Sequence, residues 1–308
     1  MKFKIDFDFP ESPQKIEPTD KIVSLGSCFS EEIGHRLENL HFSIQINPFG
    51  VIFHPLAIAN LLQNAIAKDV QANLLQRVDL FFAWEAAEKI FGYSETACQN
   101  EFQLQLKTFS DNLASADWLF ITFGTANGYR LKSDGKIVAN CHKKPADLFQ
   151  KELTSLEEMT KVWKELLADL KNRFPLLKVV FTISPVKYLR DGIIENVRSK
   201  ARLVELIQQL DGIYFPAYEI VSEELRDYRI YKSDLAHPNE LATEYVYERF
   251  CATFFAEKTK IFAQDMAQFN RVQNHKIAFE NSISAKKLRE NIEHQKEELQ
   301  KKYPFLAL

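Results

Sequence analysis

Residues 21–40, KIVSLGSCFSEEIGHRLENL, decide the fold of this 308-residue chain. A short apolar and β-branched run ends in a Gly-Ser-Cys turn, and in the segment after it Phe29, Ile33 and Leu37 recur on one helical face. This order predicts a strand, a tight turn and a helix. A Ser or Cys on such a turn lies at the carboxyl edge of a sheet with the helix N-terminus behind it, which suits a nucleophile. The other interpretation is a tight turn that carries a buried cysteine.

Outward from this unit, short β-branched or aromatic runs alternate with amphipathic stretches along the chain. The predicted strands are Lys21–Leu25, Phe42–Ile46, Trp118–Phe123, Val179–Ile183 and Ile213–Phe215. The predicted helices are Phe29–Leu40, Pro55–Ala67, Glu101–Ser115, Asp147–Asn172, Asn196–Leu210 and Glu240–Glu257. Their alternation predicts the α/β class, with a three-layer α/β/α sandwich around a parallel five-stranded sheet.

Two segments do not fit this alternation. Residues 74–93 are predicted to form a hairpin insertion beside the sheet. Residues 259–308 are strongly charged and helix-favouring, so we expect a C-terminal helical arm after a main domain of residues 1–258. The arm is either a solvated helix packed along the domain or the contact of a homo-oligomer.

Composition excludes several function classes. None of the nine glycines forms a G-x-G pair and no Gly-Lys-Ser/Thr closes a phosphate loop, so we expect no nucleotide cofactor. A net charge of −3, with basic residues spread along the chain, argues against a nucleic-acid partner. No signal peptide or membrane span is visible, so the four widely spaced cysteines are expected to be reduced thiols in the cytoplasm. No metal is expected, because the histidines lack ligand spacing.

A second chemical motif, SDLAHPNELATEY, stands near the end of the domain. Asp234 and His237 are three residues apart, and such a loop lets a carboxylate orient an imidazole that serves as general base. Pro238 at the first helical position predicts that His237 caps the last core helix. The alternative interpretation is a capped loop with an Asp–His pair at the surface.

The two motifs stand in the chain order of the SGNH hydrolase superfamily, the GDSL-type esterases and acyltransferases. GSCFS at Gly26–Ser30 resembles the motif of the GSCFA-domain family and differs at its last position. The other segments that resemble this family are Asn47–Pro55, Phe123–Tyr129, Asn140–Pro145, Thr182–Gly192 and Tyr214–Arg229. The resemblance covers residues 20–255 and implies an SGNH-like, flavodoxin-like sandwich. It also implies an esterase or O-acyltransferase, with an acylated carbohydrate as the substrate.

The resemblance also implies roles for single residues. Aligned with the superfamily's G-D-S-L-S, GSCFS places Cys28 on the nucleophilic serine, and Ser27 is the second candidate. The helix N-terminus lowers the pKa of a thiol at this position, whereas Glu31 and Glu32 raise it.

An oxyanion hole in the superfamily uses main-chain and amide donors from two further loops. Gly50 matches the first loop. On the second, aligning G-x-N-D with GTAN shifts Asn127 by one position, so Asn127, Asn47 or His142 are the candidate donors.

Two hypotheses follow. The first is a cytoplasmic enzyme that makes or breaks acyl esters through an acyl-enzyme on Cys28, with His237 as general base and Asp234 as its orienting carboxylate. The second is a non-catalytic ligand-binding or assembly module on the same fold.

Overall fold

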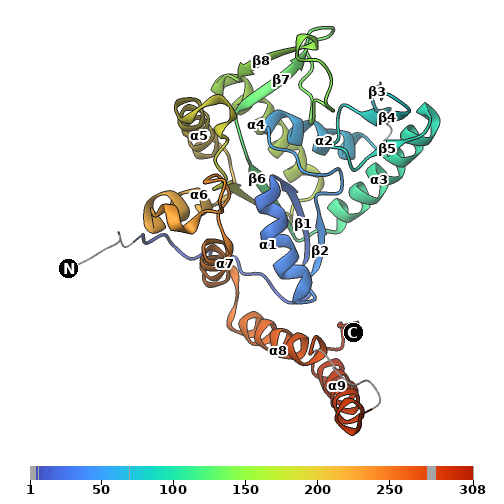
Figure 1. The fold of residues 1–308 in the computed structure, drawn as a ribbon, viewed down its shortest axis with the longest axis vertical. Coiled ribbons are helices and arrows are strands. Elements are labelled where there is room, and N and C mark those ends of the chain that lie inside the picture. Colours follow the sequence, from blue (N-terminus) through green and yellow to red (C-terminus); the bar gives the residue numbers. More distant parts are fainter. Residues whose placement is uncertain (1–4, 6, 69, 276–281, 308) are drawn as a thin grey trace.

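A computed structural model describes residues 5, 7–68, 70–275 and 282–307, and its centre is a parallel five-stranded sheet (Figure 1). The strands are β1 (Lys21–Gly26), β2 (Ser43–Ile46), β6 (Trp118–Phe123), β9 (Lys178–Ile183) and β10 (Ile213–Phe215). They lie in the order β10-β9-β6-β1-β2 and pair in parallel. Counted along the chain this is the 2-1-3-4-5 order of flavodoxin-like folds. The α/β prediction is confirmed.

Helices cover both faces of the sheet because alternate strand residues point to opposite sides. Val23 and Leu25 join the core under α2 (Pro55–Ala67), α3 (Glu95–Ser115), α4 (Leu156–Arg173) and α5 (Ile193–Gln208). Ile22 belongs to the opposite core, with side chains of α1 (Cys28–Asn39) and α7 (Glu240–Phe254). The two cores make the three layers of the sandwich.

The helix predicted at Asp147–Asn172 is wrong over its first residues. Phe149–Leu153 forms strand β8, which pairs antiparallel with β7 (Asn127–Leu131). α4 begins only at Leu156, because the side chain of Ser155 accepts a hydrogen bond from the Glu158 N–H and caps the helix. The ribbon β7–β8 was missed because its residues are mixed in polarity and lack a strict alternation.

Residues 74–92 form a small antiparallel sheet of β3 (Leu74–Arg77), β4 (Leu80–Ala83) and β5 (Phe91–Gly92). It packs against α3 at one end of the sandwich (Figure 1). The shorter helical segments lie beyond the ends of β9 and β10. They are η2 (Leu189–Asp191), α6 (Ala217–Glu219), η3 (Ile220–Leu225) and η4 (Tyr228–Ile230), while η1 (Ala146–Leu148) precedes β8.

The C-terminal segment consists of α8 (Glu257–Gln273) and α9 (Ile283–Lys302), which extend away from the sandwich (Figure 1). α8 is joined to the main domain, since Phe262 and Met266 enter the core under α1 and α7. α9 lies against α8 and buries only Ala285 among its described residues. In the described part of the chain, no helix is both long and apolar enough to cross a membrane.

Candidate active site

The turn between β1 and α1 is fixed by a close approach of two strand ends. Gly26 has a φ of +139°, and a Cβ there would lie 2.2 Å from the carbonyl oxygen of Thr122 at the end of β6. The Ser27 N–H donates to that same oxygen over 3.1 Å. Glycine is therefore the residue that lets the turn lie against β6, and this close contact sets where α1 begins.

The two candidate nucleophiles have different surroundings. Ser27 is 1% exposed, and its Oγ accepts a hydrogen bond from the Phe29 N–H, so it serves as the N-cap of α1. Cys28 is the first residue of the helix and is half-buried. Of the two side chains, the thiol is the one that a ligand can reach.

The Cys28 thiol is protonated near neutral pH. Burial raises its pKa above the ordinary value, and Glu31 and Glu32 raise it further, while main-chain N–H groups at the start of α1 oppose them. The thiol is therefore a weak nucleophile by itself, and its attack on a carbonyl requires a base that removes its proton.

An imidazole suited to that task lies on the loop before α7. His237 Nδ1 and Asp234 Oδ2 are 2.6 Å apart, and Asp234 Oδ1 accepts hydrogen bonds from the N–H groups of Ala236 (2.9 Å) and His237 (3.0 Å). These N–H groups and the imidazole hold the pKa of Asp234 well below its usual range. Because the carboxylate remains charged, it keeps a proton on Nδ1 and leaves Nε2 as the acceptor.

His237 is not the cap of α7. The helix begins at Glu240 and its N-cap is Asn239, whose side chain accepts from the Ala242 N–H. Main-chain bonds from Lys232 N–H to the His237 carbonyl (2.7 Å) and from Asn239 N–H to the Ile230 carbonyl (2.7 Å) hold the loop instead.

Main-chain hydrogen bonds join this loop to the others at the carboxyl edge of the sheet. They run from Ile52 N–H to Gly26 O (2.9 Å), from Gly124 N–H to Phe53 O (2.8 Å), from Ser184 N–H to Phe123 O (2.8 Å) and from Lys187 N–H to Ala236 O (3.0 Å). The loops after β1, β2, β6 and β9 and the His237 loop therefore meet at one edge.

In the described part of the chain no hydrogen bond joins Cys28 Sγ to His237, so the imidazole must approach the thiol for proton transfer.

Two of the candidate oxyanion donors, Gly50 and Asn47, make hydrogen bonds within the protein, and Asn47 holds the turn between β1 and α1. The Gly50 N–H donates to the Asn47 carbonyl over 2.9 Å. Asn47 Oδ1 accepts from the Gly26 N–H (2.9 Å), and its Nδ2 donates to Glu31 Oε1 (3.2 Å). The Gly50 N–H and one of the two Nδ2 protons of Asn47 are therefore used within the protein.

His142 lies against the β3–β5 sheet. Its Nε2 is 3.1 Å from the carbonyl oxygens of both Ala83 and Ala86, its ring packs on Phe82, and burial lowers its pKa. An imidazole bonded in this way donates through Nε2 to the insertion. Its contacts connect the loop after β7 with the insertion rather than with the Cys28 turn.

Asn127 differs from these candidates. It is 8% exposed, and its side-chain Nδ2 is buried without a hydrogen-bond partner among the described residues. Its main-chain N–H donates to Thr125 Oγ1 (3.0 Å), and Thr125 in turn contacts Ser199 of α5 (3.0 Å), so the loop is well fixed. An unpaired buried amide costs about 1–3 kcal/mol. Such a buried and unpaired donor is uncommon in folded proteins and calls for an explanation.

Sequence reasoning missed Lys200. This lysine of α5 is 2% exposed, and its Nζ donates to the carbonyl oxygens of Gly124 (2.8 Å) and Ser184 (2.6 Å), at the ends of β6 and β9. Burial lowers its pKa to about 7, while the charges of Cys28 and Glu219 act in the opposite direction. Helical periodicity could have found it, because Lys200 shares the inner face of its helix with Leu203.

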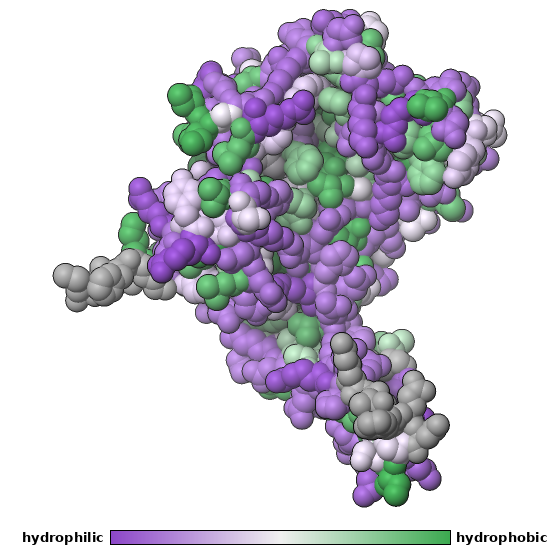
Figure 2. Space-filling model, in the orientation of Figure 1, coloured by the Kyte–Doolittle hydropathy of each residue, from purple (hydrophilic) through white to green (hydrophobic). Residues whose placement is uncertain are grey.

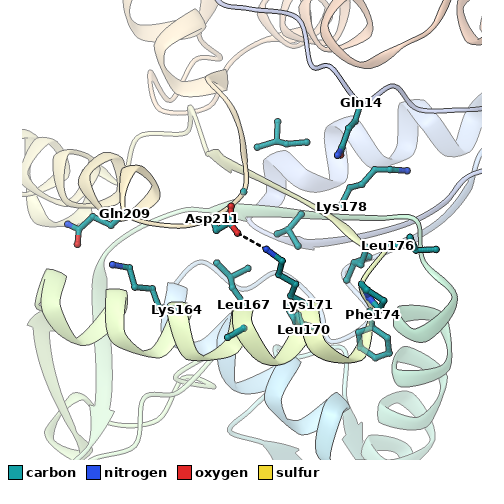
Figure 3. A pocket seen from close by; sticks show the side chains of 16 residues that line it. Gln14, Lys164, Leu167, Leu170, Lys171, Phe174, Leu176, Lys178, Gln209 and Asp211 are labelled. Atoms are coloured by element: carbon teal, nitrogen blue, oxygen red, sulfur yellow. Dashed lines mark hydrogen bonds and ion pairs between the residues drawn. The ribbon is translucent and has the colours of Figure 1, made fainter.

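A surface cavity of about 900 Å³ lies at the opposite edge of the sheet (Figure 3). The end of α4 and the starts of β9 and β10 line it, and Figure 3 shows Lys171 reaching Asp211 across it, with 3.4 Å between their charged atoms. None of the candidate site residues lines this cavity. Among the described residues, no cluster of three or more His, Cys, Asp or Glu side chains could hold a metal ion.

Comparison with known proteins places the chain in a family. Residues 21–250 match the GSCFA family, and the protein belongs to it. No functionally curated protein has significant sequence similarity to the chain. Among solved structures it is similar to a carbohydrate esterase family 3 protein from Talaromyces cellulolyticus, with 8% identity and a TM-score of 0.38 over 80% of this chain and 99% of that one.

Lys200 makes stability depend on pH in a specific direction. Its pKa is about 7 in the folded protein and 10.5 in an unfolded chain, so between these values the unfolded state binds more protons and stability rises with pH. We expect the free energy of unfolding of the wild type to increase relative to that of Lys200→Met as pH rises from 7 towards 10.5. Below pH 7 the difference between the two proteins should not change with pH. Urea denaturation at a series of pH values measures it.

Lys171→Met is the matched control, because this lysine is 75% exposed at the surface of α4. The difference in the free energy of unfolding between Lys171→Met and the wild type should not rise between pH 7 and 10.5. A Lys200→Met difference that stays constant from pH 7 to 10.5 would contradict the assignment.

Proposed function

We propose that the protein transfers acyl groups from esters to water or to an alcohol, through a thioester on Cys28. The observation that carries the proposal is the Asp234–His237 pair, 2.6 Å between Oδ2 and Nδ1, at the sheet edge that also holds the half-buried Cys28. A carboxylate, an imidazole and a thiol are the groups that acyl transfer by nucleophilic catalysis requires.

The reaction would proceed in two balanced halves. His237 Nε2 takes the proton of Cys28 as Sγ attacks the ester carbonyl carbon. The C–O bond of the tetrahedral intermediate then breaks, and Nε2 returns the proton to the leaving alcohol oxygen. Water or a second alcohol next gives a proton to Nε2 and attacks the thioester. The S–C bond breaks, and Sγ recovers its proton.

Asn127 is the best-supported oxyanion donor. Its buried Nδ2 has no partner in the described part of the chain, whereas the Gly50 N–H and one Nδ2 proton of Asn47 already donate within the protein. The first main-chain N–H groups of α1 lie at the Cys28 turn and can add to it. Gly50 and Asn47 would then position the turn that carries Cys28, and His142 would hold the insertion of residues 74–92.

Membership of the GSCFA family and the motif order resembling SGNH hydrolases support the same reading. An acylated carbohydrate remains a prediction of that resemblance. The competing function is a binding module, favoured by the absence of a bond between Cys28 and His237 among the described residues. Trapping of the acyl-enzyme decides between them.

Acylation should be visible in the mass of the intact protein. After exposure to p-nitrophenyl acetate, the wild type should gain one acetyl group, and Cys28→Ala should not. Cys141→Ala is the matched control, since Cys141 is also half-buried and also has a raised pKa. Ser27→Ala should keep the adduct.

An adduct that persists in Cys28→Ala and disappears in Ser27→Ala would move the nucleophile to the serine. No adduct with several activated esters would favour the binding module.

Asp234→Asn tests the orienting carboxylate while preserving the loop. An amide Oδ1 still accepts from the N–H groups of Ala236 and His237, but Nδ2 now faces His237 Nδ1 and favours the wrong tautomer. We expect the acylation rate to fall by about 10³- to 10⁴-fold with the stability little changed.

Asp227→Asn is its control, because Asp227 also accepts from a main-chain N–H two residues on, that of Arg229 (2.8 Å), away from the motif. Equal losses in the two variants would exclude a specific role for Asp234.

Asn127→Ala separates catalysis from structure. Because Nδ2 bonds to no described residue, its removal should not lower the free energy of unfolding, while loss of an oxyanion donor should slow acylation by about 10²- to 10³-fold. Stopped-flow acylation and urea denaturation measure the two effects. Lower stability with an unchanged rate would show that the amide serves the fold.

A further inference from the structure

An apolar groove of about 520 Å³ lies beside the Asp234–His237 loop. Its walls come from the segment after β9, the first turns of α5, and the helical segments between β10 and that loop. The apolar and aromatic side chains that line it are Leu189, Ile193, Val197, Tyr218, Tyr228 and Leu235.

The groove exposes apolar side chains that the fold does not need at the surface. Ile193 is 68% exposed, Val197 53% and Tyr228 66%. Figure 2 shows hydrophobic residues at the surface in the region where Figure 1 draws α5. A contiguous apolar surface of this kind is typical of a binding site.

Lys187, Tyr228 and Tyr231 form one wall of the groove and contact one another. Lys187 Nζ lies 3.8 Å from the ring centroid of Tyr231 and 4.4 Å from that of Tyr228, and burial lowers the pKa of this lysine. Its main-chain N–H donates to the Ala236 carbonyl over 3.0 Å. The same residue therefore contacts both aromatic rings and the loop that carries His237, so the groove wall is joined to that loop.

The position of the groove decides which part of an ester it can hold. Leu235 lies in the motif between Asp234 and His237, so the groove begins where the base is held. Asn127 follows β6, on the other side of β9 in the sheet, so the carbonyl oxygen belongs towards β6. The leaving oxygen must lie at His237 Nε2, since that atom returns the proton to it.

We propose that this groove binds the apolar body of the alcohol half of the ester, as leaving group or acceptor. This inference rests on the proposed acyl transfer. As the C–O bond breaks, the alcohol oxygen takes its proton from His237, and the carbon chain or ring attached to that oxygen extends past Leu235 between Val197 and Tyr228. The substrate class is then an ester of an alkyl or aryl alcohol.

The lining suits an apolar alcohol better than a sugar. Few polar groups line the groove: Asn196, whose Oδ1 already accepts from the Tyr188 N–H over 2.8 Å, Lys187, Ser222 and the tyrosine hydroxyls. A sugar carries hydroxyl groups on most of its carbons, and each needs a partner when it leaves water. An apolar chain needs only the hydrophobic contact that these walls supply.

Two series of esters test which half of the substrate the groove holds. The first combines acetate with primary alcohols from methanol to hexanol, and the second combines methanol with acids from acetic to hexanoic. We expect kcat/KM to rise along the alcohol series by about two- to fourfold for each CH₂. A rise along the acid series instead, or a flat alcohol series, would overturn the proposal.

Val197→Asp and Ile194→Asp are a matched pair of variants. Both residues are exposed on α5, but only Val197 lines the groove, and Ile194 is 76% exposed. Val197→Asp should abolish the rise along the alcohol series. Ile194→Asp should behave as wild type. The same chain-length dependence in both variants would contradict the assignment.

Binding of 1-naphthol, an aromatic alcohol without an ester, tests the groove independently of catalysis. Fluorescence titration should show binding that Val197→Asp weakens about tenfold or more, because a carboxylate would be buried against the ring. Ile194→Asp and Cys28→Ala should leave binding unchanged. Absence of binding would overturn the groove assignment, whereas intact binding without ester turnover would fail only the proposed acyl transfer.

Discussion

The candidate site depends on the hydrogen bonds that the buried Lys200 side chain makes. Its two hydrogen bonds, to Gly124 O and Ser184 O, join the ends of adjacent strands β6 and β9 from the helix side. The neighbouring Ser199 Oγ accepts from the Ala126 N–H over 2.7 Å and fixes the same loop. Burial of a charged ammonium group costs free energy, which is why the pKa of Lys200 is lowered to about 7 although Nζ is well hydrogen-bonded. The loop that it holds is the one that presents Asn127.

The Cys28 thiol and the Asp234 carboxyl group, both at the carboxyl edge of the sheet, differ in their protonation near neutral pH. The Cys28 thiol has a raised pKa and the Asp234 carboxyl a lowered one, and each shift follows from its surroundings: burial with nearby glutamates for the thiol, and donated hydrogen bonds for the carboxyl. The thiol of the proposed nucleophile is therefore protonated, whereas the Asp234 carboxylate beside His237 is charged. This arrangement suits a thiol that is activated only as substrate binds and His237 approaches, rather than a free and generally reactive thiolate.

Sequence patterns predicted the sheet because its strands are buried apolar runs with turn residues at their ends. They failed at β8, since Phe149–Leu153 lies on a two-stranded ribbon where packing does not impose a period. They could place Cys28 directly after β1, and Asp234 and His237 directly before α7, because these positions adjoin predictable elements. The state of Asn127 could not be predicted, because whether Nδ2 finds a partner depends on contacts from several distant segments. Likewise, the sequence does not show that the Gly50 N–H donates a hydrogen bond to the Asn47 carbonyl, because this bond depends on the local turn.

The most direct measurement is a crystal structure of the protein treated with an alkyl trifluoromethyl ketone, whose carbonyl carbon a thiol converts into a tetrahedral adduct. The account predicts a bond from Cys28 Sγ to that carbon. It also predicts Asn127 Nδ2 about 2.7–3.1 Å from the adduct oxygen and His237 Nε2 within hydrogen-bond reach of the reacting atoms. An adduct on another residue, or one on Cys28 with the Asn127 amide still unpaired and His237 remote, would contradict it.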